Sequence, residues 1–314
     1  MAGAVIQSTQ FQRLLDKRLD EVYKMPSELD RTVDSLFKKV KSDKAWYEAF
    51  NVSGLGDVRE FNGALEYLTM APGYYVRIEP AEFAAGIQIE RKLLDDDLYG
   101  VVKLQANLVN SEKRKRDKIA TEAFAHAFSA AFDFGTNEEG VALCSNSHTT
   151  KTPGVSTSTG FDNLITDAIS KTSLSAARIV MRKFKDSIGE RIEVDPDMVI
   201  MPDDLYPSFC EAVGYDALSG ASSDRDPISS EGMINSQFKY YKPFVIRRLS
   251  DYDTSDWFMV DSKLMKENLI WVDRIAADLE TTWDFETKAY KQSIYSRFGY
   301  GWLDWRFILG AQVS

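Results

Sequence analysis

The sequence predicts an α+β fold, and three observations carry this prediction. A turn-rich, strand-like stretch runs from Trp46 to Arg91, and a long helical pattern follows from about Asp95 to Phe132. Strand signals then dominate the last part of the chain, after a middle section with shorter helical patterns. Helices and strands are thus both present and occupy different parts of the chain.

Composition limits the class of protein. The chain has 314 residues, of which 44% are hydrophobic and 12% aromatic, enough for a large core in one elaborate domain or two. It has no signal-like start and no apolar run that approaches eighteen residues, so we expect a soluble protein that is not exported. Two cysteines fit a reducing compartment. The net charge of −10 argues against general affinity for nucleic-acid phosphates.

The stretch from Trp46 to Arg91 reads as two extended segments joined by turns. The part "YYVRIEPAEFAAGIQIE" alternates and is rich in β-formers, and glycines and prolines upstream supply the turns. A long β-excursion is hard to bury within one subunit, and an isolated ribbon is marginal on its own. The excursion therefore predicts a partner surface.

The helix expected over Asp95–Phe132 carries an apolar stripe at i, i+3, i+4 spacing in its second half. The acidic run at Asp95–Asp97 fits a helix start, where carboxylates cap and complement the dipole. Its middle, "EKRKRDK" from Glu112 to Lys118, has a nucleic-acid interpretation, but no aromatic residues accompany the basic ones. We favour a solvated or subunit-facing stretch.

Shorter elements follow. Phe161–Ile169 shows a helical face, and another helical pattern follows Ser173 as its cap. The apolar run Met198–Met201 stops at Pro202, after which Asp203 is expected to cap a helix. Residues 214–232 read as a loop. The remaining strand signals include five of the six tryptophans, which predicts a core or contact surface built late in the chain.

One of the two cysteines lies close to one of the two histidines, in "VALCSNSHTTKTPG". Cys144 and His148 could form a nucleophile and its base, but the polar run ending in Pro-Gly predicts an exposed loop without a cysteine-protease signature. A zinc site would also need His126 and Cys210, and the paired close spacings of such sites are missing. Cys210 is expected to be a small buried residue on a short helix.

Other chemical motifs are missing from the sequence. It has no phosphate-binding G-x-x-x-x-G-K-[ST], no G-x-S-x-G and no G-x-G-x-x-G followed by a helix pattern. The glycines of Gly54–Gly63 are not followed by a helix either. We therefore predict no enzymatic activity, no catalytic residue, no metal and no cofactor.

The order of these elements resembles a known family. The β-excursion, "GIQIERKLLDDDLYG" leading into a long helix, the loop "GVALCSNSH", "VIMPDDLY" and the ending "YSRFGYGWLDWRFILGA" are similar to tailed-phage major capsid proteins. The resemblance covers the chain from about Trp46 to the end and implies the Hong Kong 97-type fold, close to Mu-like major head subunits. In such proteins the Cys/His loop has no catalytic role.

The resemblance implies a domain organisation. Residues 1–45 would be an N-terminal arm, 46–91 an extended β loop over a neighbouring subunit, and 92–150 a peripheral domain with a spine helix. Residues 151–265 would form an axial domain, and 266–314 would return to the peripheral domain. Charged residues of the extended loop are then the expected subunit contacts: Arg59, Glu60, Glu66, Arg77 and Glu79.

The implied function is a virion shell, assembled in the host bacterial cytoplasm from hexamers and pentamers around double-stranded DNA. Expected partners are further copies and separate scaffolding, portal and decoration proteins, with no membrane and no sequence-specific DNA contact. Some members cross-link through a lysine in the extended loop, but no lysine occurs from Ala45 to Arg91, so this linkage is not expected. Only some forty residues precede the excursion, which favours a separate scaffold.

Three alternatives stay open. A cellular nanocompartment shell could share the fold and enclose protein cargo. A cysteine hydrolase would depend on Cys144, and a nucleic-acid-binding module on Lys113–Arg116.

Overall fold

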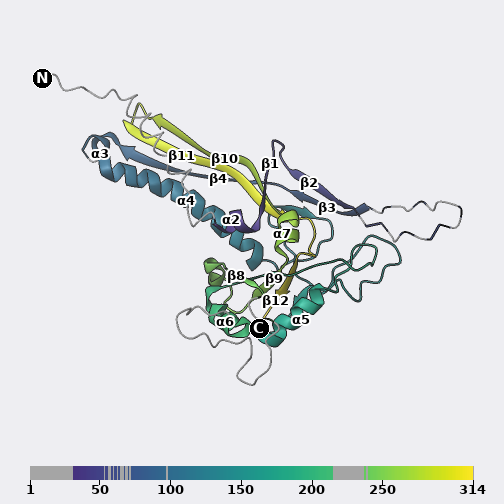
Figure 1. The fold of residues 1–314 in the computed structure, drawn as a ribbon. Coiled ribbons are helices and arrows are strands. Elements are labelled where there is room, and N and C mark those ends of the chain that lie inside the picture. Colours follow the sequence, from purple (N-terminus) through teal and green to yellow (C-terminus); the bar gives the residue numbers. More distant parts are fainter. Residues whose placement is uncertain are drawn as a thin grey trace.

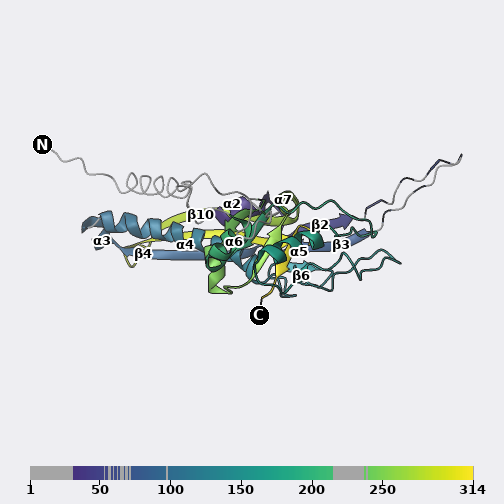
Figure 2. The same cartoon turned by 60° about the horizontal axis from the view of Figure 1, so that its bottom comes forward.

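The structure, a computed structural model, describes residues 31–313 except residues 53, 56, 57, 59, 62, 64–66, 68, 69, 71, 97, 215–236, 238 and 239. Figure 1 shows a long sheet with a helix along it, a smaller sheet unit beside the end of that helix, and an arm that extends away on the other side. Seen from below in Figure 2, these parts make an elongated, rather flat molecule.

In chain order, the described elements are α2 (Arg31–Leu36), β1 (Lys38–Lys41), β2 (Tyr47–Val52), β3 (Pro72–Ile78), β4 (Ala81–Glu90), α3 (Arg91–Asp96), α4 (Leu98–Ala125), β5 (Gly135–Asn137), β6 (Leu164–Ile165), α5 (Lys171–Met181), β7 (Met198–Met201), η2 (Asp203–Leu205), α6 (Tyr206–Val213), β8 (Lys242–Val245), η3 (Arg247–Asp251), β9 (Trp257–Val260), α7 (Ser262–Asn268), β10 (Leu269–Trp283), β11 (Ala289–Trp302) and β12 (Ile308–Ala311).

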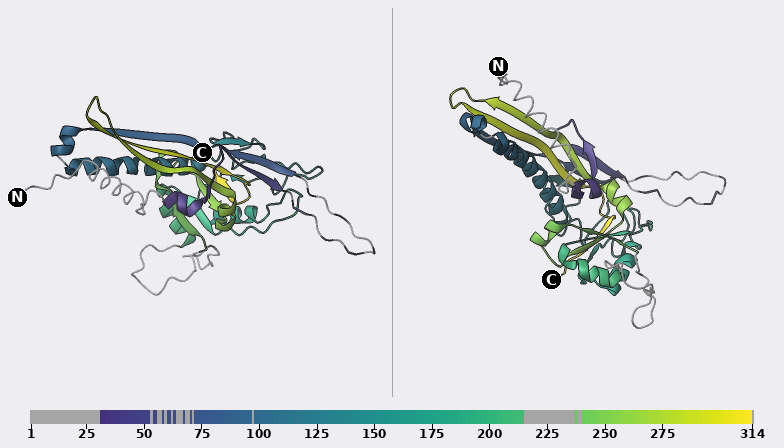
Figure 3. Two further views of the ribbon diagram at one scale, coloured as in Figure 1. Left: turned by 90° about the horizontal axis from the view of Figure 1, so that it is seen from above. Right: turned by 60° about the vertical axis from the view of Figure 1, so that its left-hand side comes forward.

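The long sheet has the strand order β1-β10-β11-β4. β1 is parallel to β10, and β11 is antiparallel to both β10 and β4. Along β11, residues 290, 292, 294, 296 and 298 are buried while the odd-numbered positions from 291 to 297 are only half-buried. The period of two places every second side chain on one face, where α4 packs (Figure 3). We call α4 the spine helix.

A five-stranded sheet, ordered β6-β12-β9-β7-β8, forms the second unit. Its central strands β9 and β12 are buried at every position, as expected for strands covered on both faces. The helices α5 and α6 lie beside it (Figure 1). We call this part, with η2 and η3, the five-stranded unit. Its core is continuous with that of the long sheet and includes Trp257, Phe258 and Trp271.

A third sheet, ordered β2-β3-β5, forms the base of the arm. β2 pairs antiparallel with β3 from Tyr47↔Ile78 to Val52↔Pro72, and β5 pairs with the other edge of β3. Gly135 belongs to this junction because a Cβ there would lie 2.0 Å from the carbonyl oxygen of Arg77. The predicted extended segments are present as β2 and β3, but the last part of the predicted excursion, β4, is a strand of the long sheet and is paired with β11.

The predicted long helix is present, but it ends earlier than predicted. It consists of α3 and α4, and α4 ends at Ala125, seven residues before Phe132. The carbonyl of Ala127 accepts the N–H of Cys144 at 2.8 Å, outside the helical ladder. The apolar stripe continues because Phe128 stacks on Phe258 and Phe132 packs edge-on against Trp302.

The helix predicted over Phe161–Ile169 is wrong. Leu164 and Ile165 form strand β6, which pairs parallel with β12. The side-chain amide of Asn163 donates to the carbonyls of Leu143 and Ile308, which holds this segment extended between two others. Long-range hydrogen bonds therefore override the local periodicity.

Two predicted caps are also wrong. Ser170, and not Ser173, caps α5, and Ser173 is its reciprocal partner in a capping box. Asp203 is the first residue of η2, whose N-cap is Pro202, and α6 begins only at Tyr206. Cys210 lies on α6 as expected but is partly exposed. The loop predicted over residues 214–232 lies, except for Gly214, outside the described residues.

Candidate assembly surface

The arm exposes large apolar side chains. Phe50 is 70% exposed on β2, where its ring makes a tilted contact with Tyr75 at 5.4 Å, and Val58 is 94% exposed. Single exposed apolar residues are ordinary, but a group of them on one projecting segment indicates an interaction surface. The members described between residues 50 and 70 are Phe50, Leu55, Val58, Phe61, Tyr67 and Met70.

Two of the predicted contact residues meet at the base of this arm. The Arg77 guanidinium lies 2.8 Å from the Glu79 carboxylate and 4.1 Å from the centre of the Trp46 ring. Both contacts lie within the subunit, where β2 pairs with β3. Glu60 is exposed on the loop beyond β2. Arg59 and Glu66 lie outside the described residues.

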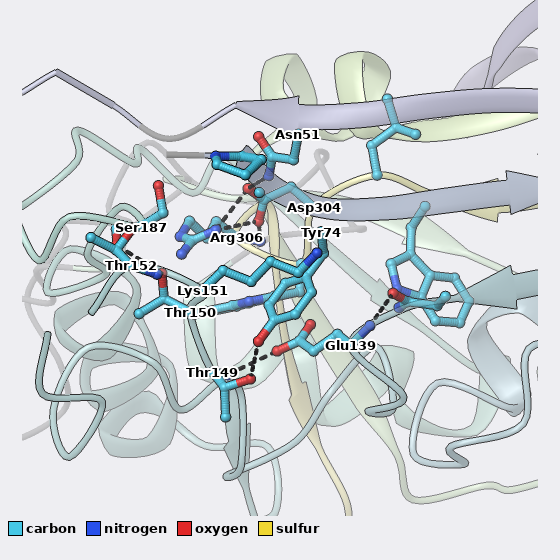
Figure 4. Close-up of a pocket in the computed structure, with 16 residues that line it drawn as sticks. Asn51, Tyr74, Glu139, Thr149, Thr150, Lys151, Thr152, Ser187, Asp304 and Arg306 are labelled. Atoms are coloured by element: carbon cyan, nitrogen blue, oxygen red, sulfur yellow. Dashed lines mark hydrogen bonds and ion pairs between the residues drawn. The ribbon is translucent and has the colours of Figure 1, made fainter. Parts of the chain in front are cut away.

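A polar crevice joins the arm to the loop that follows β5 (Figure 4). Tyr74 on β3 shares a 2.6 Å hydrogen bond with Thr149, and the Asn51 amide donates to Asp304 at 3.0 Å. Two cations line the crevice, and both are already paired: Lys151 with Glu138 at 2.5 Å and Arg306 with Asp304 at 2.8 Å. The Lys151 ammonium and the Tyr75 N–H hold the pKa of Glu138 below its usual value. The polar groups of the crevice are therefore used to connect the arm with the loop after β5.

The loop around Cys144 is exposed at Asn146, Ser147, Thr149 and Lys151, as predicted, but its cysteine and histidine are buried. Cys144 is 1% exposed and His148 is 2% exposed. Side chains on either side of the two residues hold the loop in place: the side-chain oxygen of Asn163 accepts the Ser145 N–H, and Glu139 accepts the Thr149 N–H. Polar composition alone gave no sign of this pairing.

Cys144 and His148 do not form a nucleophile–base pair. Nδ1 of His148 lies 3.1 Å from Glu139 Oε1, and the imidazole stacks on Trp305. The Cys144 thiol packs against Gly310, and burial raises its pKa well above the usual value. An activated cysteine requires the opposite shift. The geometry thus argues against a cysteine hydrolase.

The run from Glu112 to Lys118 is divided between solvent and core. Arg114 and Lys118 are exposed, as the solvated interpretation predicts, but four residues of the run are buried and this interpretation is wrong for them. Exposure is 6% for Glu112, 3% for Lys113 and 8% for both Arg116 and Asp117. Arg116 pairs with Asp273 and lies over the rings of Trp271 and Phe298. Long apolar stems and internal ion pairs allow such a run to face a core. A nucleic-acid surface over residues 113–116 is thereby disfavoured.

No metal site or membrane span is found in the described part of the chain. No three His, Cys, Asp or Glu side chains among those residues could share a metal ion. None of the described helices combines the length and apolar character needed to cross a bilayer.

Solved structures with the same fold are shell proteins. The capsid of the native GTA particle has a TM-score of 0.55 and 13% identity, with 92% of this chain and 91% of that chain covered. The procapsid of bacteriophage JBD30 has a TM-score of 0.51 and 12% identity, with 100% and 77% covered. The SrpI encapsulin complex from Synechococcus elongatus PCC 7942 has a TM-score of 0.52 and 9% identity, with 90% and 88% covered.

These likenesses define a class of shell-forming α+β folds, and the predicted Hong Kong 97-type fold is confirmed. The profile described as "Phage capsid protein" matches residues 74–311, more than half of the chain. The chain belongs to the phage capsid protein family. No curated protein sequence is significantly similar to it. The resemblance to Mu-like major head subunits and the domain boundaries stay predictions.

The predicted subunit contacts are all charged, and the exposed apolar side chains of the arm, such as Phe50, Phe61 and Tyr67, are not among them. The sequence shows these large apolar residues between the glycines of the stretch, but their exposure is seen only in the structure.

Proposed function

We propose that this chain is the major capsid protein of a tailed double-stranded DNA phage. In this proposal it assembles through hexamers and pentamers into an icosahedral shell in the host bacterial cytoplasm. Membership of the phage capsid protein family supports a shell, and the exposed apolar arm is the observation that carries self-assembly. Many moderate interfaces that close on themselves make a stable shell even when each one is weak.

The arm would lie over a neighbouring copy, which would cover the apolar side chains of residues 50–70. Residues 46–91 are then the extended loop, residues 92–150 and 266–314 the peripheral domain, and residues 151–265 the axial domain. We propose Arg59, Glu60, Glu66, Arg77 and Glu79 as subunit contacts. Arg77 and Glu79 are paired with each other at the base of the arm, partly exposed, where a neighbouring copy could reach them.

Separate scaffolding, portal and decoration proteins are the proposed partners. DNA would be enclosed without sequence-specific contact, in keeping with the net charge of −10. Since residues 45–91 contain no lysine, the shell would be held by non-covalent contacts at the arm.

Electron microscopy of the purified protein, alone and with a neighbouring scaffold candidate, tests the proposal. Closed shells large enough for a genome, or rings of six and five copies, are expected. The triple variant Phe50→Ser, Val58→Ser, Phe61→Ser should remain folded and lose assembly. The matched variant Phe50→Leu, Val58→Ile, Phe61→Leu should keep it. A monodisperse monomer or dimer under all conditions would contradict the proposal.

A nanocompartment shell is the second candidate, and the likeness to an encapsulin structure favours it. The contents of the particles separate the two functions. Packaged DNA of genome length supports the phage shell, whereas small particles filled with one protein cargo support the compartment.

A further inference from the structure

The spine helix is attached to the five-stranded unit at two places. Near its end, Phe124 packs edge-on against Phe258 on β9 with ring centroids 5.7 Å apart, and Phe128 stacks on the same ring at 5.4 Å. These aromatic contacts are the first attachment. They are close to the point where α4 ends.

The second attachment is an ion pair nearer the middle of the helix. Nε of Arg248, on η3, donates to Asp117 Oδ2 at 2.8 Å. The other carboxylate oxygen of Asp117 accepts the hydroxyl of Thr32, on α2, also at 2.8 Å. The Asp117 side chain is 12% exposed, so water competes little for it. One carboxylate therefore joins three separate segments of the chain.

The spacing of the two attachments decides what they do together. Asp117 and Phe124 are seven residues apart, which is two helical turns and about 10 Å along the axis. The Asp117–Arg248 pair is thus a second tie between the spine helix and the five-stranded unit, two turns from the aromatic one, in addition to the core that the helix shares with both sheets.

The adjacent residue secures the helix on its other side. Arg116 pairs with Asp273 on β10 and lies 4.9 Å from the centre of the Phe298 ring on β11. Residues 116 and 117 consequently tie the helix to the long sheet and to the five-stranded unit. A weaker contact, from the Tyr252 hydroxyl to Glu122 at 3.3 Å, supports the same junction.

We propose that the Asp117–Arg248 pair is a latch that sets the angle between the spine helix and the five-stranded unit, and thereby the curvature at which copies close into a shell. The curvature part rests on the proposed function. Copies that pack in closed rings must present their contact surfaces at a narrow range of angles. If the angle between the spine helix and the five-stranded unit varied, it would vary in every copy, and the curvature of the shell would vary with it.

The test compares shell diameters by electron microscopy in four proteins. Arg248→Gln removes the pair, and Arg248→Lys keeps the charge. The control Arg182→Gln breaks the 2.7 Å pair with Asp195, which lies within the five-stranded unit and does not reach the spine helix. We expect one narrow diameter for the wild type, Arg248→Lys and Arg182→Gln, and several diameters or open shells for Arg248→Gln. An unchanged diameter distribution in Arg248→Gln would overturn the proposal.

A measurement on unassembled subunits separates the latch from shell formation. Spin labels at Asn110→Cys on the spine helix and Ile179→Cys on α5, both exposed, report the inter-unit distance in a Cys210→Ser background. Arg248→Gln should broaden this distance distribution. If Arg248→Gln does not fold, Thr32→Val replaces it in the test and should broaden the distribution to a smaller extent. If Arg248→Gln broadens the distribution but the wild type forms no shells, the latch is supported and the capsid function is refuted. An unchanged distribution would refute the latch itself.

Discussion

The imidazole of His148 lies flat on the indole of Trp305, with ring centroids 4.2 Å apart and planes 10° apart. The same imidazole pairs through Nδ1 with Glu139, so one buried ring joins the loop after β5 to the segment between β11 and β12. We expect His148→Ala to lower the free energy of unfolding by about 2 kcal/mol, since it removes a buried hydrogen bond and an aromatic contact. Urea unfolding measures this loss.

His126 provides the control for that variant. Its side chain is 42% exposed and pairs with Asp133 at 3.0 Å. Because exposed pairs contribute little, His126→Ala should cost under about 1 kcal/mol. Equal losses for the two alanine variants would show that the stacked ring has no special structural role.

The two thiols should differ in reactivity. Cys144 is buried, and burial raises its pKa, so little thiolate is available, whereas Cys210 on α6 is partly exposed. Iodoacetamide should modify Cys210 in the native protein and Cys144 only after unfolding. Peptide mass spectrometry over time distinguishes the two sites. Modification of native Cys144 as fast as Cys210 would reopen the possibility of a reactive cysteine.

Gly310 should not tolerate a side chain. A Cβ at this position would lie 2.7 Å from both Cys144 Sγ and Phe128 Cε1. Gly310→Ala should therefore cost about 1–3 kcal/mol through overpacking, measured by thermal or urea unfolding. The added change Cys144→Ala removes the sulfur and should recover part of the loss. If the double variant is as unstable as the sum of the single ones, the clash is not with Cys144.

Acid should weaken the turn between β10 and β11. Asp284 accepts hydrogen bonds from Lys291 and from the N–H groups of Glu286 and Thr287, which lower its pKa to about 2. A carboxyl whose folded pKa lies below its unfolded value of 3.8 stabilises the protein above pH 4, and that stabilisation is lost as the pH falls toward 2. Asp284→Asn should thus be less stable than the wild type at pH 7, and the difference should shrink as the pH falls through 4 toward 2. A difference as large at pH 2 as at pH 7 would contradict this assignment.

The fold was predictable where local pattern and tertiary contact agree. The strands over residues 257–260, 269–283 and 289–302 and the body of the spine helix follow from periodicity and β-formers. The expected helix start at Asp95–Asp97 is wrong, because Asp95 and Asp96 are the last residues of α3. The prediction failed where a distant partner decides the conformation. Leu164 and Ile165 are extended because β12 offers them a parallel edge, and nothing within ten residues indicates that edge.

The sequence indicated where the arm lies, but it did not indicate which charged residues are buried. The predicted excursion over Trp46–Arg91 contains the arm, but its last part forms β4, which is paired with β11 within the subunit. The burial of Arg116 and Asp117 depends on Asp273 and Arg248, more than a hundred residues away. A basic run looks the same in the sequence whether its partners are solvent, phosphate or carboxylates of the same subunit. The pairing that makes residues 116 and 117 internal could be recognised only in three dimensions.

The continuity of β11 and β12 has a mechanical consequence. β11 is a central strand of the long sheet, and after a short turn the same chain becomes β12, a central strand of the five-stranded sheet. Tension that pulls the two sheets apart therefore passes along a covalent backbone and not only across side-chain packing. To yield, β11 would have to slide against β10 and β4 together, breaking many hydrogen bonds at once. A wall built from such subunits resists stretching from within through its polypeptide backbones.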